Sequence, residues 1–164
     1  MKKHIMALML ATSLVLTACG GTESKPKVEV DPNLGAGMTD AQKEKNDRDI
    51  LDKVMKATQS AVKESGFNKT FEIKIIDGET KVVCQGSSDS ENEALVSALA
   101  KNLGISESDI YNETAGKLCM DSTKGKGITA SSMFSDTGTP TVLVFAAGNK
   151  KISSTTMATA VNNY

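Results

Sequence analysis

Hydrophobic residues recur along the chain with two different periods, and the first is helical. Between Thr39 and Gly66 apolar side chains return every three or four residues, which predicts one amphipathic helix over this range. Thr39 and Gln42 have the spacing of a capping box at its start. Because the run from Lys43 to Asp49 is wholly polar, we expect the first third of the helix to be solvated. The buried stripe is predicted to contain Ile50, Leu51, Val54, Met55, Thr58, Ala61 and Val62.

A period of two follows, and it predicts a β-hairpin. Apolar residues alternate with charged ones from Phe71 to Ile75, which gives a strand one apolar face. Asp77-Gly78 is a strong signal for a two-residue turn. The return strand is expected over Thr80 to Cys84.

The remainder of the chain predicts a second helix and further antiparallel strands. The helix is expected from Ser90 to Leu103, with Ser90 and Glu93 as its capping box. Residues 105–127 have no clear period, although 106–111 suit a short helical turn. Strands are predicted over 127–134, 141–146 and 151–157.

These elements indicate an α+β fold. A long N-terminal amphipathic helix packed on a four- to five-stranded antiparallel sheet, with a second and shorter helix, would bury both sets of apolar faces. We expect residues 39–164 to form a single α+β globular domain.

The first 18 residues do not belong to that domain. Met1 to His4 is basic, and Ile5 to Leu16 is almost entirely apolar. A helix of this length covers about 18 Å, whereas a bilayer core is about 30 Å thick. The segment is therefore predicted to be a signal peptide.

The four residues Leu16-Thr17-Ala18-Cys19 at its end resemble the lipobox of bacterial lipoproteins. The resemblance implies cleavage before Cys19, a diacylglyceryl thioether on its sulfur and a further acyl chain, such as palmitate, on its amine. It implies a lipid-anchored protein on the extracytoplasmic face of the cell membrane or outer membrane. An ordinary signal peptide with a chance cysteine is the alternative. Residues 19–38 are expected to form a lipidated flexible tether, since they are polar and contain Pro26 and Pro32.

Charge and composition limit the kinds of partner and site that the mature chain can have. Loss of Lys2 and Lys3 with the leader changes the formal net charge from −1 to −3, so nucleic acid is not an expected partner. His4 is the single histidine and leaves with the leader. A mature chain without imidazole cannot build a histidine-based triad or histidine-ligated zinc. No cofactor and no metal site are predicted.

Two cysteines, Cys84 and Cys119, remain beside the one in the lipobox. A pair in an exported chain favours a disulfide. Two buried free thiols are the alternative, because cysteine packs as a small hydrophobe.

Ser60-Ala61-Val62-Lys63 matches the S-x-x-K pattern of a serine nucleophile. The accompanying S-D-N and K-T-G patterns do not occur in the chain. We therefore interpret Ser60 and Lys63 as solvated side chains on the polar face of the first helix, and no catalytic residue is predicted.

Two further patterns have the same kind of interpretation. Asp47, Asp49 and Asp52 lack the glycine and glutamate of an EF-hand loop and are taken as a solvated helix face. Residues 124–127, Lys-Gly-Lys-Gly, lack the full spacing of a phosphate-binding loop and are taken as a turn.

The globular part is similar to the heads of type IV pilins and pseudopilins. Residues 47–62 look like the C-terminal half of a pilin's first helix, and residues 141–157 look like its last strands. The prepilin leader and the apolar stem of that family do not occur in the chain. The resemblance thus implies an architecture rather than filament assembly.

The function that the sequence favours is a non-catalytic binding or scaffolding module, anchored by lipid, with a protein partner in the cell envelope. The alternative is a small-ligand-binding lipoprotein associated with a transporter. A hydrolase using Ser60 and Lys63 is a third hypothesis, and we do not expect an enzyme.

Overall fold

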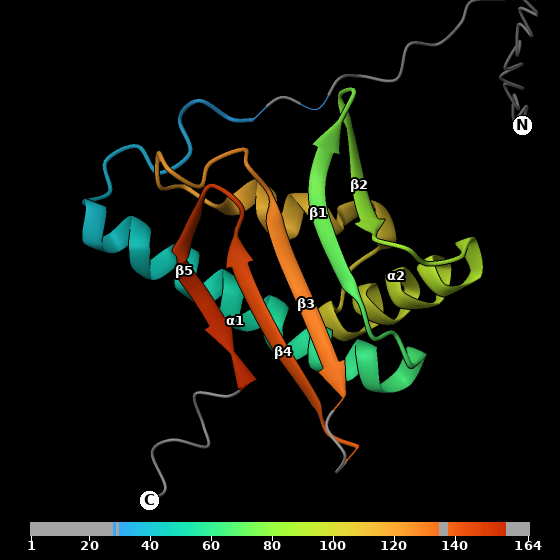
Figure 1. Ribbon diagram of the computed structural model, residues 1–164. Helices are drawn as coiled ribbons and strands as arrows, with labels where there is room; N and C mark the ends of the chain where they lie inside the picture. Colours follow the sequence, from blue (N-terminus) through green and yellow to red (C-terminus); the bar gives the residue numbers. More distant parts are fainter. Residues whose placement is uncertain (1–27, 29, 135–137, 157–164) are drawn as a thin grey trace, which may run out of the picture.

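A five-stranded antiparallel sheet with helices on one of its faces forms the structure (Figure 1). This computed structural model describes residues 28, 30–134 and 138–156. The strand order is β2-β1-β3-β4-β5. The strands are β1 (Thr70–Ile76), β2 (Glu79–Cys84), β3 (Ile128–Phe134), β4 (Pro140–Ala146) and β5 (Asn149–Thr155). The α-helices are α1 (Asp40–Ser65), α2 (Asp89–Leu103) and α3 (Ile110–Glu113). The predicted α+β class is confirmed.

Helix α1 has the predicted limits. The Gln42 N–H donates to Thr39 Oγ1 at 3.3 Å and the Thr39 N–H donates to Gln42 Oε1 at 2.8 Å, which completes the capping box. Gly66 ends the helix in a left-handed conformation. The helix packs on β4, β5 and α2, so it covers one half of the sheet while α2 and α3 lie toward the other half.

The predicted hairpin is confirmed, and the structure adds its position in the sheet, which the sequence did not predict. Asp77 and Gly78 both have positive φ, at 54° and 80°, as a type I′ turn requires. Strand β1 pairs with β2 on one side and with β3 on the other, where Phe71 lies opposite Ala130. The hairpin therefore contributes the edge strand β2 and the interior strand β1 next to it.

Helix α2 begins earlier than predicted. Its N-cap is Ser88, and the capping box is made with Glu91 rather than by Ser90 and Glu93. Lys69 Nζ lies 3.2 Å from the Glu91 carboxylate. The Ser88 backbone and then Lys69 lower the pKa of Glu91. Lys69, in the loop before β1, thus stabilises the capping box of Ser88 and Glu91.

The region without a clear period consists of short helical pieces. Two 3-10 turns, Glu107–Asp109 and Ala115–Lys117, flank α3. Residues 118–127 then lead to β3. Strand β5 starts at Asn149, two residues before the predicted position, and the predicted end at residue 157 lies outside the described residues.

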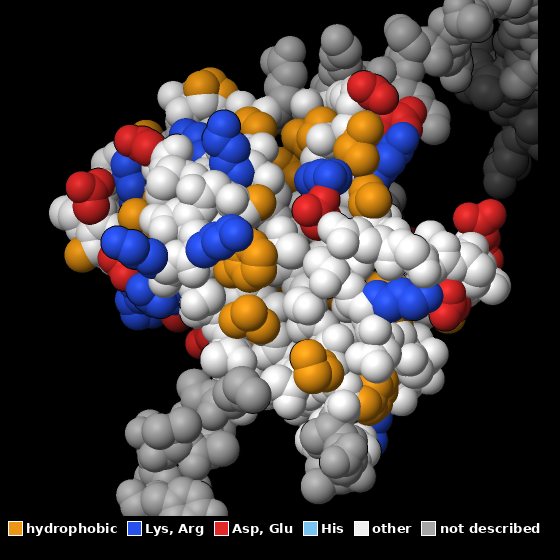
Figure 2. Space-filling model, in the orientation of Figure 1, with side chains coloured by type: hydrophobic (Ala, Val, Ile, Leu, Met, Phe, Trp, Pro, Cys, Tyr) orange, Lys and Arg blue, Asp and Glu red, His pale blue; other side chains and the backbone are white. Residues whose placement is uncertain are grey.

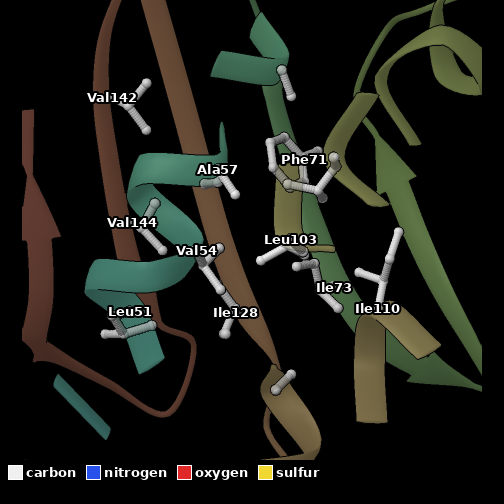
Figure 3. Close-up of a cluster of buried hydrophobic side chains, with 14 of the residues drawn as sticks. Leu51, Val54, Ala57, Phe71, Ile73, Leu103, Ile110, Ile128, Val142 and Val144 are labelled. Atoms are coloured by element: carbon white, nitrogen blue, oxygen red, sulfur yellow. The ribbon is translucent and has the colours of Figure 1, made fainter. Parts of the chain in front are cut away.

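The core lies between the sheet and its helices (Figure 3). Phe71 on β1 is fully buried, and its ring meets that of Phe67 edge to face with centroids 6.1 Å apart. Side chains from α1 meet side chains from the inner face of β3 and β4. The residues labelled in Figure 3 are Leu51, Val54, Ala57, Phe71, Ile73, Leu103, Ile110, Ile128, Val142 and Val144. With the inner face thus filled, the other face of the sheet is left for contact with solvent.

Candidate interaction surface

The outer face of the sheet is not covered by the described helices, and we call it the open face (Figure 2). Strand alternation sends every second side chain to this side. On β1, β3, β4 and β5 the open face consists of Thr70, Glu72, Lys74, Ile76, Thr129, Ser131, Met133, Thr141, Leu143, Phe145, Lys151, Ser153 and Thr155.

The register arranges these residues in rows across the sheet. One row runs from Thr70 through Ser131 and Leu143 to Thr155, and the Thr70 hydroxyl lies 3.2 Å from that of Ser131. A neighbouring row runs from Glu72 through Thr129 and Phe145 to Ser153.

Apolar side chains lie among these hydroxyl groups. Met133 is 69% exposed and Leu143 is 42% exposed. Three large hydrophobic side chains are exposed among the described residues, and two of them are on the open face; Met38 is the third. Phe145 is partly exposed beside Lys150, whose Nζ lies 5.6 Å from the ring centroid. The open face is therefore a mixed surface, with apolar side chains among hydroxyl-bearing ones.

Charges at the β1–β2 side of the sheet are paired. Lys74 forms an ion pair with Glu72 on the same strand. At the edge of the sheet, Lys81 Nζ lies 3.3 Å from the Glu79 carboxylate. Met133 and Leu143 therefore lie among neutral hydroxyls, whereas Phe145 lies beside Lys150, which forms no ion pair with the described carboxylates.

Ser60 and Lys63 line one open pocket of about 240 Å³ near the start of β4. Gln59, Gly138, Thr139 and Pro140 complete its wall. Within the described residues, no hydrogen bond joins the Ser60 hydroxyl to the Lys63 amine, and both side chains are exposed. Among the described residues, Ser60 thus has no hydrogen bond to the lysine of its S-x-x-K pattern.

We expected the first third of α1 to be solvated. This prediction is wrong at Asp47, which is fully buried. Its carboxylate accepts the N–H of Cys119 at 2.8 Å, the N–H of Met120 at 3.3 Å and the hydroxyl of Thr123. Residues 119–123, which precede β3, therefore pack against the first third of α1.

A sequence signal for that burial exists. Asp47 precedes Leu51 by four residues and Val54 by seven, which places it on the buried stripe of the helix. With Asp49 and Asp52 both exposed, the three aspartates do not form one cluster. Within the described ranges, no three His, Cys, Asp or Glu side chains are arranged to hold a metal ion.

The structure does not bring Cys84 and Cys119 together, and both are free thiols. Cys84 ends β2 opposite Phe71, whereas Cys119 is buried beside Asp47. Burial raises the pKa of both thiols, and the Asp47 carboxylate raises that of Cys119 further. The disulfide remains a prediction that this conformation does not contain.

Cys19 and the rest of the lipobox lie outside the described residues. None of the helices within the described ranges is both long and apolar enough to cross a membrane. No family model, curated protein or solved structure matches this chain.

Proposed function

We propose that this protein is a lipid-anchored lipoprotein of the extracytoplasmic cell envelope that binds a protein partner without catalysing a reaction. The observation that carries the proposal is Leu16-Thr17-Ala18-Cys19 directly after a short apolar segment with a basic start. Two or more acyl chains on one cysteine give stable membrane attachment, whereas a single chain gives only marginal attachment. The pilin-like resemblance enters the proposal as an architecture alone.

The binding surface in this proposal is the open face. Its support is the exposure of Met133 and Leu143 within rows of threonine and serine hydroxyls. A partner that covers these side chains removes apolar surface from water at about 25 cal/mol per Å². The hydroxyls supply hydrogen bonds at the rim of the same contact.

We expect the exchange Cys19→Ser to release the protein from membranes. The wild-type protein from a lipoprotein-processing host should enter the detergent phase on Triton X-114 partition, because its acyl chains are apolar. The serine variant, exported behind an ordinary signal peptide in place of residues 1–18 so that no apolar leader is retained, should stay in the aqueous phase, since a hydroxyl cannot form the thioether to the diacylglyceryl group. The matched control is Cys84→Ser, which should partition like the wild type. If the Cys19 variant entered the detergent phase as the wild type does, the anchor would be refuted.

We expect a photo-crosslinker at the open face to capture a partner. The replacement Leu143→p-benzoylphenylalanine places the probe in the middle of the sheet, and Lys56→p-benzoylphenylalanine places it on the exposed side of α1. Irradiation of native membranes should give a discrete adduct of defined mass with the first variant only. Adducts of equal yield from both positions, or none from either, would contradict this use of the open face.

A further inference from the structure

Four lysines gather at the end of the sheet where the segment from the predicted anchor reaches the domain. We call Lys124, Lys126, Lys150 and Lys151 the lysine platform. Lys126, Lys150 and Lys151 are exposed, and within the described residues no carboxylate forms an ion pair with any of the four. Figure 2 shows basic side chains gathered over this part of the molecule.

Two loops hold the lysine platform together. The Ala147 N–H donates to the Gly127 carbonyl at 3.0 Å, and Asn149 Nδ2 donates to Ser122 Oγ at 3.2 Å. A Cβ on Gly148 would lie 1.9 Å from the Ser122 carbonyl oxygen and 2.8 Å from Lys126 Cγ, so only glycine permits this approach. The loop before β3 and the β4–β5 turn therefore form one closely packed unit.

Acidic groups near the lysine platform have other partners. Asp121 lies 3.9 Å from Lys43 Nζ, and Asp31 accepts the N–H of Asn33 at 2.8 Å. Arg48, which pairs with Glu44, also reaches the Lys151 carbonyl at 3.5 Å. The platform therefore has positive charge that is not balanced by an ion pair.

The chain leading from Cys19 reaches the domain at the same place. The Val28 N–H donates to the Gly78 carbonyl at 3.0 Å, and Lys124 Nζ donates to the Pro32 carbonyl at 2.9 Å. Val30 lies against Gly125, where a Cβ would meet its Cγ2 at 2.9 Å. Residues 28 and 30–38, which we predicted to be part of the tether, thus include contacts with the domain.

These contacts limit how far the domain can stand from the lipid. Only nine residue steps separate Cys19 from Val28, and they span at most about 30 Å when fully extended. Contact between the lysine platform and the headgroups is well within that reach. Basic residues next to an anionic leaflet are attracted to it over about one Debye length.

We propose that the lysine platform docks on anionic phospholipid headgroups of the membrane that holds Cys19. The inference rests on the proposed lipid anchor. In this orientation the strands point away from the bilayer, because the platform lies at one end of them (Figure 1). The open face then stands at the side of the molecule, accessible to a partner.

The test uses a chain that starts at Gly20, so that no acyl chain contributes. This chain keeps every core residue, since the core lies within residues 51–152. We expect it to sediment with vesicles rich in phosphatidylglycerol and not with vesicles of phosphatidylcholine alone. Binding should be lost when the salt concentration is raised from about 50 mM to about 500 mM, because screening shortens the range of the attraction.

The decisive variant is K124Q/K126Q/K150Q/K151Q. Each lysine near an anionic surface raises the partition coefficient about fivefold, so the variant should bind at least about 100-fold more weakly. The matched control is K53Q/K56Q/K63Q/K101Q, which removes four exposed lysines from the helices and should bind like the parent chain. Both variants should keep the unfolding midpoint of the parent.

Equal binding of the two variants, or binding of the parent that does not depend on phosphatidylglycerol, would overturn the proposal. Because this chain has no Cys19, either result leaves the anchor untouched. Failure of the anchor would instead appear in the phase partition of Cys19→Ser.

Discussion

Asp47→Ala is expected to destabilise the protein by about 3–5 kcal/mol, since several buried groups lose their acceptor at once. The carboxylate is fully buried and accepts hydrogen bonds from the backbone of Cys119 and Met120 and from Thr123. No other acceptor for these two N–H groups is present among the described contacts. Urea unfolding followed by circular dichroism measures the change.

Two companion variants make that result specific. Asp49→Ala removes an exposed carboxylate two residues away, whose ion pair with Lys45 is on the surface, and should cost less than about 1 kcal/mol. Asp47→Asn keeps the shape of the side chain and one acceptor oxygen. Its loss of stability should therefore lie between those of Asp47→Ala and Asp49→Ala. Equal stability of the Asp47→Ala and Asp49→Ala variants would show that the buried carboxylate does not hold the 119–123 segment.

Phe71→Ala is expected to cost a similar amount, about 3–5 kcal/mol, because it leaves a cavity in the core. The Phe71 side chain is fully buried on the inner face of β1, and the substitution also removes its edge-to-face contact with Phe67. The free energy of unfolding in urea provides the measurement.

The control for Phe71→Ala is the same exchange on the other face of the sheet. Phe145 is partly exposed, and its described ring contact is with the Lys150 amine. A cation–π contact at an exposed site contributes about 0.5–1 kcal/mol. Phe145→Ala should therefore cost much less than Phe71→Ala. If the costs were reversed, the assignment of inner and outer faces would be wrong.

Local patterns predicted the elements that depend on neighbours in sequence. The capping box at Thr39 and the Asp77-Gly78 turn each act within four residues, so α1 and the first hairpin follow from the sequence. The start of α2 was misplaced because Ser88 and Ser90 each precede a glutamate by three residues. Local sequence does not separate the two patterns, whereas Lys69 contacts Glu91 from the loop before β1.

The candidate surface needed information from distant residues. Thr141 to Ala146 is apolar at almost every position, so the sequence does not tell which of Val144 and Phe145 faces the core. Packing against α1 buries Val144 and leaves Phe145 on the open face. The burial of Asp47 likewise depends on residues more than seventy positions away.

The place of β1 between β2 and β3 has a consequence for the order in which the protein folds. Phe71 meets Ala130 across the sheet, so 59 residues must emerge before this pairing can begin. Until then the chain offers an isolated hairpin, which is marginal in water. Contacts of such long range slow folding because loop closure precedes any gain from them. A chain whose emergence stops before Ile128 would thus leave the apolar side of α1 without its strands, and chaperones or proteases could bind it there.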